Sequence, residues 1–258
     1  MLTRDRPQMA ARALAAFRAQ TYPETHRALF ILDNGPKSTP GLPYGERLVA
    51  SIWVPDQAGK TIGSLRNGAI RSALGWRNFD VVVTMDDDDL SHPWRIAEQV
   101  ALLQSSGADC VGYNEVLFWR HTLAHDGRDT GVRLMIDDIP VEPIRTVLWE
   151  GPGEAWLYSN RSPAYCTGAS LCYWRKTWER HPFPDAQVGE DNAFLQSIRD
   201  AGGKVVGVSG KSWPPSYVEP RLIQSIHGGN TAAMIDPKSD QWRRAPEWDA
   251  YARERMAL

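Results

Sequence analysis

The stretch Phe79-Asp80-Val81-Val82-Val83-Thr84-Met85-Asp86-Asp87-Asp88-Asp89 joins an apolar run to four consecutive aspartates, and it decides the fold. The apolar part is rich in β-branched residues on both faces, which predicts a strand buried on both sides, as in a parallel sheet. Ser91 and Pro93 follow as a candidate helix cap and a first-turn proline, so we expect a helix directly after the aspartates. In an open α/β sheet, ligands bind just beyond the carboxyl ends of the strands, where these aspartates would lie.

The four aspartates predict a cation site. Adjacent carboxylates repel one another by as much as ~4 kcal/mol per close pair at an effective dielectric constant near 20. A divalent cation relieves that repulsion, and hard divalent ions prefer oxygen ligands. The ordinary interpretation of a charge run is a solvated acidic turn. The position directly after a buried strand favours the metal site over that alternative.

The composition bounds the class of protein. At 258 residues the chain has room for one large α/β domain or two small ones. A formal net charge of −2 gives no support for a nucleic-acid partner. Three cysteines without metal-type spacing predict buried free thiols in a reducing compartment. No stretch approaches the roughly 18 apolar residues of a membrane span and no signal peptide opens the sequence, so we expect a cytoplasmic protein.

Strand and helix patterns alternate through residues 1–113, which predicts parallel βαβ units. The expected elements are a strand ending at Met1–Thr3, a helix at Gln8–Gln20, strands at Arg27–Leu32 and Arg47–Val54, a helix at Ser64–Leu74, the strand Phe79–Met85, a helix at Trp94–Leu103 and a strand at Asp109–Tyr113.

The pattern changes after residue 114. The expected elements there are strands at Val116–His121 and Gly131–Ile136, a long ordered loop at Trp149–Pro163, helices at Tyr173–Arg180 and Asp191–Ala201, and a strand at Lys204–Val208. We therefore predict a single α/β domain over residues 1–235, in two halves, 1–113 and 114–235. In the tail, 236–258, Trp242, Trp248 and Tyr251 suggest a helix that caps the domain, with an oligomer contact as the alternative.

Several segments resemble family 2 glycosyltransferases in order and spacing. They are Thr3-Arg4-Asp5-Arg6-Pro7 with Gln20-Thr21-Tyr22-Pro23, Leu32-Asp33-Asn34-Gly35, Ser64-Leu65-Arg66-Asn67-Gly68-Ala69, and Met85-Asp86-Asp87-Asp88-Asp89 with His92-Pro93-Trp94-Arg95. Further on, Val188-Gly189-Glu190-Asp191 resembles the acidic motif on that family's acceptor side. The resemblance covers roughly residues 1–230.

The resemblance implies the GT-A fold, a Rossmann-like domain with a mostly parallel central sheet flanked by helices. Residues 1–113 would bind the nucleotide sugar, and 114–235 would form a smaller acceptor-side subregion. It implies transfer of a sugar from a nucleoside diphosphate, UDP or GDP in type, to a hydroxyl group of a glycan or other small molecule. Inversion at the anomeric carbon and a Mn²⁺ or Mg²⁺ cofactor are expected.

The resemblance assigns metal and donor roles to the acidic run. Asp86 and Asp88 match the DxD motif, with Asp86 facing the ribose or the metal and Asp88 ligating the metal. Asp87 would contact the nucleotide sugar, and Asp87 with Asp89 forms a second possible DxD pair. The spacing from strand to proline favours Asp86 and Asp88. His227 matches a late histidine that adds a further metal ligand, and a structural histidine is the equal alternative.

Nucleoside contacts are implied for Thr3, Arg4, Asp33, Arg66 and Asn67. The alternative for Asp33 is a turn-forming aspartate before Asn-Gly. For Arg66 it is an ordinary surface arginine on an amphipathic helix.

The acceptor side supplies a candidate general base. Asp191 would take the proton of the acceptor hydroxyl, with Glu190 beside it as the second candidate. The alternative for both is the common bias of acidic residues toward helix N-termini. Candidate acceptor contacts are Trp156 and Tyr158, whose rings could stack on a sugar, with Thr167 and Gly168, which match a family turn near the donor sugar.

The sequence departs from the family at its start, because only Met1 and Leu2 precede Thr3 where a full apolar strand is usual. Either the true start lies upstream, or the first strand is shortened and the nucleotide-base pocket is weakened.

Two rival functions stay open. One is a catalytically degenerate module that binds nucleotide sugars, which the short strand favours and the acidic motifs oppose. The other is a sugar-phosphate nucleotidyltransferase, although residues 3–7 lack the glycine-rich loop of that class.

Overall fold

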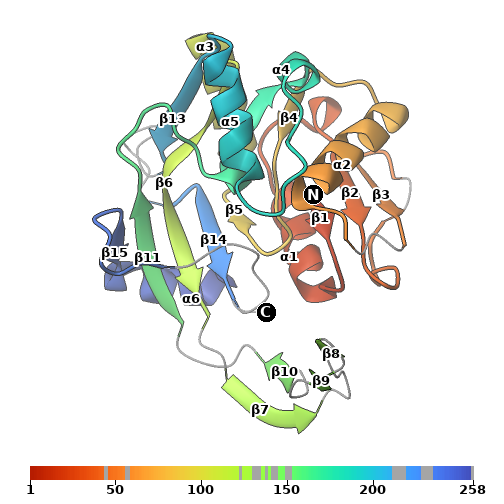
Figure 1. Cartoon of the computed structure of the whole chain (residues 1–258), viewed down its shortest axis with the longest axis vertical. Coiled ribbons are helices and arrows are strands. Elements are labelled where there is room, and N and C mark those ends of the chain that lie inside the picture. The colour runs from red at the N-terminus through yellow and green to blue at the C-terminus, as the bar shows by residue number, and fades with distance from the viewer. Residues whose placement is uncertain are drawn as a thin grey trace.

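Two β-sheets carry the fold, and the acidic run lies where they meet (Figure 1). The computed structural model describes residues 1–43, 46–55, 59–121, 153–210, 219–227 and 235–256, and also the backbone of four short strands between 124 and 148. Those four strands are β7 (Ala124–Asp129), β8 (Met135–Ile136), β9 (Ile139–Pro140) and β10 (Arg145–Leu148). They pair only with one another, β7 with β10 and β8 with β9.

The first sheet is parallel, with strand order β1-β2-β3. Its elements are β1 (Leu2–Thr3), α1 (Pro7–Arg18), a 3₁₀ turn at Glu24–His26, β2 (Leu29–Asp33), β3 (Val49–Trp53) and α2 (Ile62–Trp76). Helix α1 starts at a proline, whose fixed φ suits the first helical position. Helix α2 is capped by Thr61, whose side chain accepts from the Ser64 amide at 3.1 Å.

The second sheet is mixed and is built around one long strand, β6 (Cys110–Arg120). Its other elements are β4 (Val81–Val83), β5 (Leu90–Ser91), α3 (Arg95–Ser106), β11 (Glu154–Ser159), β12 (Cys172–Trp174), α4 (Arg175–Arg180), α5 (Glu190–Asp200), β13 (Val205–Ser209) and β14 (Leu222–Ile226). The first half of β6 pairs with β12 and β13, and its second half pairs with β11 and β14. The parallel partners of β6 are β13 and β14, while β11 and β12 run antiparallel to it.

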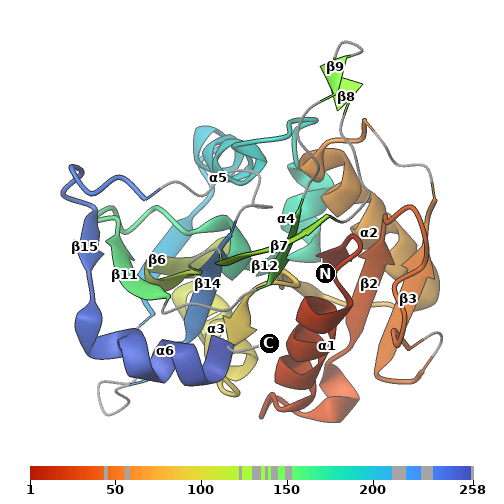
Figure 2. The same cartoon turned by 90° about the horizontal axis from the view of Figure 1, so that it is seen from below.

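The tail closes the second sheet at one edge and on one face. Strand β15 (Trp242–Arg244) pairs with β11, and helix α6 (Asp249–Met256) follows it. Ala252 and Met256 of α6 pack against Leu117, Trp119 and neighbouring apolar side chains of β6 and β11. Figure 2 shows α6 lying across this side of the strands. The tail therefore supplies a strand as well as the capping helix expected from the sequence.

Four predicted elements are wrong in detail. The expected loop at Trp149–Pro163 contains strand β11, and residues 149–152 lie outside the described part. The two strands expected at Asp109–Tyr113 and Val116–His121 are the single strand β6. The aspartates are followed by β5, which pairs with β14, and α3 begins only at Arg95, with Trp94 rather than Ser91 at the cap. Of the strand expected at Gly131–Ile136, only β8 falls within the described residues.

The remaining elements agree with the sequence within a few residues, and the three cysteines are buried free thiols as expected. Among the described residues, no helix has the length and apolarity needed to cross a membrane.

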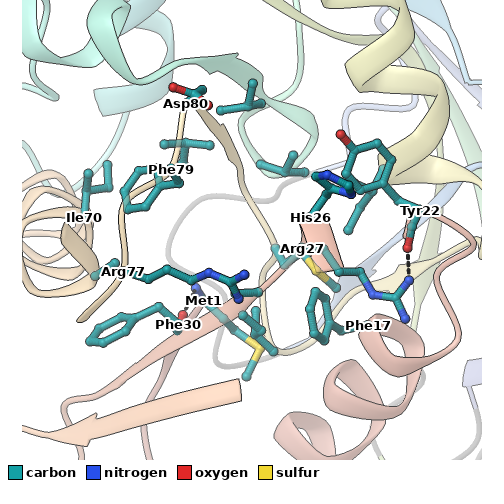
Figure 3. Close-up of a pocket in the computed structure, with 18 of the residues that line it drawn as sticks. Met1, Phe17, Tyr22, His26, Arg27, Phe30, Ile70, Arg77, Phe79 and Asp80 are labelled. Carbon is teal, nitrogen blue, oxygen red and sulfur yellow. Dashed lines mark hydrogen bonds between the residues drawn. The ribbon is translucent and has the colours of Figure 1, made fainter. Parts of the chain in front are cut away.

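An apolar cavity of about 400 Å³ lies between the two sheets (Figure 3). Its walls include Phe30 of β2, Val81 and Val83 of β4, and Ile70 of α2. Strand β1 has only two residues, and β4 pairs with β12 alone among the described strands, so no strand bridges β2 and β4 here. The Met1 ammonium lies in this cavity and donates to the Phe30 carbonyl at 2.8 Å. Burial lowers the pKa of that amine from 8.0 to about 6.

Candidate functional site

A cleft of about 430 Å³ lies beyond the carboxyl end of β4, where the acidic run leaves the sheet. Its lining comes from both halves of the chain. The polar and glycine residues on it include Arg6, Arg66, Asp86, Asp87, Asp88, Asp89, Thr167, Gly168, Glu190, Asp191, Gln224 and Ser225. The aromatic residues on it are Phe118, Tyr158, Tyr165 and Trp242. The cleft thus has an acidic wall and an aromatic wall.

Two arginines, the buried Arg95 and the half-buried Arg12, bond to backbone carbonyls around the acidic run. Arg95, 1% exposed, donates to the carbonyls of Thr84 at 2.7 Å and Ala169 at 2.6 Å, on either side of the cleft floor. Arg12 donates to the Asp88 carbonyl at 2.7 Å and to the Met256 carbonyl at 2.8 Å. Sequence reasoning missed both roles, because a single arginine in a helical pattern does not reveal that it faces a loop distant in the sequence.

Asp87 and Asp88 share one arginine but differ in protonation. The Arg6 guanidinium lies 3.2 Å from Asp87 and 3.0 Å from Asp88, and Thr3 donates to Asp87 at 2.8 Å. Burial raises the pKa of Asp87 to about 7 in spite of these partners. Burial also opposes ionisation of Asp88, but the hydrogen bond with His227 and the charge of Arg6 hold its pKa below the usual value. Asp88 is therefore the carboxylate that stays ionised near neutral pH.

Asp86 and Asp89 face in different directions. Asp86 lies 3.6 Å from the Arg66 guanidinium. Asp89 accepts from the Ser225 amide of β14 at 2.9 Å, and burial with the charges of Asp88 and Asp86 raises its pKa well above the usual value. Asp89 is thus engaged by the protein's own backbone, whereas Asp86 and Asp88 contact the side chains of Arg66 and His227.

His227 lies beside the acidic run, 139 residues further along the chain. Its Nε2 is 3.0 Å from Asp88 Oδ2, so two of the predicted metal ligands meet. No group of three His, Cys, Asp or Glu side chains within the described ranges converges as a metal cluster. A carboxylate with an imidazole is nevertheless a suitable partial donor set for Mn²⁺, and substrate oxygens can complete it. Arg6 provides the positive charge at Asp88 in this structure.

Arg66 links the acidic wall to the predicted base region. It contacts Asp86 on one side and Glu190 at 3.2 Å on the other, and its guanidinium lies 5.8 Å from the centre of the Phe183 ring. Burial works against its charge, but Asp86, Glu190 and Asp191 together raise its pKa above the usual value. The alternative of an ordinary surface arginine does not hold, because the side chain is only 13% exposed and lies between the carboxylates of Asp86 and Glu190.

Glu190 and Asp191 begin helix α5 but are placed differently. Glu190 is buried against Arg66, and burial raises its pKa. Asp191 is half-buried on the cleft, and its Oδ1 accepts from the Asn192 amide at 2.7 Å. A Cβ atom on Gly168 would collide with the Asp191 carboxylate, so a glycine is needed for this approach. Of the two acids, Asp191 is the better placed to meet a substrate.

The structure does not bring two of the predicted nucleoside contacts to the cleft. Asp33 is 0% exposed, and its carboxylate accepts from the amides of Gly35 at 3.1 Å and Thr39 at 2.6 Å. This is the turn-forming role that was the alternative. Asn67 donates to the Phe183 carbonyl at 2.7 Å and accepts from Trp178 Nε1 at 2.8 Å. Both side chains are used to hold the protein's own loops.

Four further predicted residues also lie off the cleft lining, and one of them, His227, contacts Asp88 from beside it. Thr3 is buried and reaches the cleft only through Asp87. Arg4 is exposed and lies off the lining, whereas Arg6, two residues further on, lines the cleft. Trp156 donates to Glu154 at 3.3 Å, and the Arg120 guanidinium lies 5.9 Å from its ring centre. The predicted residues that do line the cleft are Arg66, Asp86, Asp87, Asp88, Tyr158, Thr167, Gly168, Glu190 and Asp191.

Comparison with solved structures places this geometry in a known fold. The structure of S. aureus TarS, residues 1–349, in complex with UDP superposes with a TM-score of 0.52 at 11% identity over 87% of this chain. The complex of the same protein with UDP-GlcNAc superposes with a TM-score of 0.53 at 11% identity over 92% of this chain. The mannosyltransferase PcManGT from Pyrobaculum calidifontis, in complex with GDP-Man and Mn²⁺, superposes with a TM-score of 0.52 at 16% identity over 89%.

The matched regions cover 59%, 61% and 56% of those three chains, respectively, so this chain spans less than two thirds of their length. No family model matches the sequence, and no curated protein matches it. At these identities the likeness shows the fold alone. The protein has the mixed α/β fold of GT-A-like glycosyltransferases, as the sequence predicted.

Proposed function

We propose that this protein transfers a sugar from a nucleoside diphosphate to a hydroxyl group of an acceptor, with inversion at the anomeric carbon. The observation that carries the proposal is the convergence on one cleft of Asp86 with Arg66, the half-buried Asp191, and Asp88, which His227 contacts from beside the cleft. These residues come from the two halves of a GT-A-like fold. The donors named in the matched structures, UDP-GlcNAc and GDP-Man, support this class of substrate.

The acidic wall would hold the donor. Asp88 and His227 would provide ligands for Mn²⁺ or Mg²⁺, with Asp86 as the third candidate on the same loop. The bound ion would stabilise the negative charge that develops on the departing diphosphate. Mn²⁺ in the matched mannosyltransferase supports this assignment. Arg66, whose raised pKa keeps it charged, would bind donor oxygens next to Asp86.

Asp191 would act as the general base. The attacking acceptor hydroxyl must lose its proton as it bonds to the anomeric carbon, and a carboxylate within hydrogen-bond reach can accept that proton. The Oδ1 atom of Asp191 already accepts from Asn192, which leaves Oδ2 for the acceptor. Glu190 is held by Arg66 on the buried side, so we assign it to positioning Arg66 rather than to proton transfer.

Calorimetric titration of UDP, GDP, UDP-GlcNAc and GDP-Man tests the donor site, with Mn²⁺ present and with EDTA. We expect metal-dependent binding of at least one of them, weakened more than ~10-fold by Asp88→Ala. Asp200→Ala, at the exposed far end of α5, is the matched control and should bind like the wild type. Absence of binding by the folded protein to all four, with and without Mn²⁺, would overturn the proposal.

A nucleotide-sugar-binding module without transferase activity is the second candidate. The local engagement of Asp33 favours it, because this residue lies on the nucleoside side of the fold and its carboxylate is used by the amides of Gly35 and Thr39. Donor binding with no sugar released or transferred, over a panel of acceptors, would select this module over the enzyme.

A further inference from the structure

Three of the four aromatic residues on the cleft, Phe118, Tyr158 and Trp242, lie on one continuous sheet face formed by four strands. Tyr158 of β11 is directly opposite Trp242 of β15, and Phe118 of β6 is opposite Gln224 of β14. Residues opposite one another on paired strands point to the same side of the sheet. Trp156, opposite Phe118, extends this face away from the cleft. The tail strand β15 thus places Trp242 in the candidate site, a residue that the sequence analysis had assigned to capping.

The two faces of this sheet differ in their cover. The side chains that alternate with the aromatic ones, such as Leu117, Trp119 and Leu157, are buried under α6. Phe118, Tyr158 and Trp242 are half-buried and border the cleft. Their ring centres are 4.9 Å apart for Phe118 and Trp242 and 5.0 Å for Tyr158 and Trp242. The three rings therefore pack against one another, and part of their surface remains exposed to the cleft.

Two buried polar atoms border the same space without partners. Gln224, 8% exposed, and Thr167, 5% exposed, both line the cleft. Within the described residues, Gln224 Oε1 and Thr167 Oγ1 have no hydrogen-bond partner. A buried polar atom without a partner is unfavourable, so these atoms mark places where a ligand group can bind. Gln224 Oε1 can only accept, and it therefore calls for a donor such as a hydroxyl group.

We infer that this face is an acceptor subsite for a neutral pyranose ring, stacked on Tyr158 and Trp242 and hydrogen-bonded through its hydroxyl groups to Gln224 and Thr167. The inference rests on the proposed function and names its acceptor class as a glycan. A pyranose has an apolar C–H face for the rings and hydroxyl groups for the unpartnered atoms. A purely apolar acceptor would leave Gln224 and Thr167 unpaired. An anionic acceptor would meet the carboxylate of Asp191 and the acidic wall.

The test is saturation-transfer NMR and calorimetry with four neutral trisaccharides: chitotriose, cellotriose, maltotriose and mannotriose. We expect at least one to bind, and Trp242→Ala to weaken that binding about tenfold. Gln224→Met keeps the side-chain length and removes the acceptor oxygen, and we expect a loss of similar size. Trp94→Ala, an exposed tryptophan away from the cleft lining, is the matched control and should bind as the wild type does.

The two variants also separate this inference from the proposed function. Donor affinity, measured on the same samples, should be unchanged in Gln224→Met and in Trp242→Ala, and unfolding curves identify any variant that fails to fold. If a trisaccharide binds and depends on Trp242 and Gln224 while no nucleotide sugar binds, the subsite stands and the transferase proposal falls. If nucleotide sugars bind but no trisaccharide does, or if both variants bind trisaccharide as the wild type does, the subsite inference is overturned.

Discussion

The cleft and the apolar cavity have nearly equal volumes, about 430 Å³ and about 400 Å³, but they differ in what their polar groups do. In the cleft, charged groups are paired across long sequence distances, as Asp88 is with His227 and Arg66 with Glu190. In the apolar cavity, the Met1 ammonium has one carbonyl as its hydrogen-bond partner among mostly apolar walls. Volume alone does not distinguish a candidate site from a gap in packing.

Substitutions in the two cavities should therefore have different effects. Changes in the cleft should alter binding and transfer more than stability, because its charges are matched to one another and to a substrate. Changes in the apolar cavity should alter stability more than activity, because unfilled apolar volume and a buried ammonium both disfavour the folded state. The predictions below test this contrast.

The largest effect should come from Asp191→Asn. We expect transfer to fall about 10³-fold, since loss of a general base typically costs 10²–10⁴-fold. Donor affinity and the free energy of unfolding should be nearly unchanged, because the side chain is half-buried and an amide oxygen can still accept from Asn192. Glu190→Gln is the comparison variant, and it should change donor affinity through Arg66. Transfer that survives in Asp191→Asn would mean that another group is the base.

The apolar cavity should be filled by lengthening β1. Four added residues, Val-Ser-Val-Ile before Met1, would extend the strand between β2 and β4 and move the ammonium out of the cavity. We expect the free energy of unfolding at pH 7 to rise by about 3 kcal/mol, from buried apolar side chains less the entropy of ordering four residues. Denaturant unfolding measures this. A Gly-Ser-Gly-Ser extension would move the ammonium out of the cavity without filling the cavity with apolar side chains, so it should raise the free energy of unfolding by less. An equal rise would mean that apolar packing does not contribute.

The Met1 amine should give the 258-residue chain a distinctive pH dependence. Its folded pKa of about 6 lies below its unfolded value of 8.0. The unfolded state therefore binds more protons between pH 6 and 8, and this group makes stability rise with pH over that range by roughly 3 kcal/mol. The contribution is fully present above pH 8 and is lost as the pH falls through 6. The gain from Val-Ser-Val-Ile should accordingly be larger at pH 6 than at pH 8, and a gain independent of pH would contradict the burial of the amine.

Gly168→Ala should affect the cleft by displacing Asp191. The added methyl group would collide with the Asp191 carboxylate, so the carboxylate must move away from its present position. We expect transfer to fall by about 10–100-fold with unchanged donor affinity, because small displacements of a catalytic group have effects of that size. Gly75→Ala, where the added Cβ meets nothing within 4 Å, is the matched control and should keep full activity. Unchanged transfer in Gly168→Ala would place the reacting atoms elsewhere.

The sequence predicted local patterns better than long-range contacts. The strand before Asp86 and the helix at Asp191 follow from runs of neighbouring residues, and the structure contains both. Strand β11 was missed because Ala155 and Leu157 pack under α6 while Trp156 and Tyr158 face the other side, so no polar alternation marks it. A strand with apolar residues on both faces gives no period-two signal.

The candidate site was predictable where a motif is contiguous and unpredictable where partners are distant. The four aspartates and Asp191 were found from the chain itself and from the family resemblance. Arg12 and Arg95 were missed, because they hold the acidic loop and the strand before it through bonds to the backbone carbonyls of Asp88 and Thr84, which no sequence pattern encodes.

The smallest functional effect should come from Asp33→Asn. This substitution tests whether the Asp33 carboxylate holds a turn or contacts the nucleoside. The structure uses both carboxylate oxygens for the amides of Gly35 and Thr39, and an asparagine can keep only one of these bonds. We expect stability to fall by about 1–2 kcal/mol, while donor affinity stays within about twofold of the wild type. The two readouts come from unfolding curves and calorimetry on the same sample. A drop in affinity with unchanged stability would restore the nucleoside contact implied by the family resemblance, since a turn-forming carboxylate that is fully buried has no oxygen to offer a ligand.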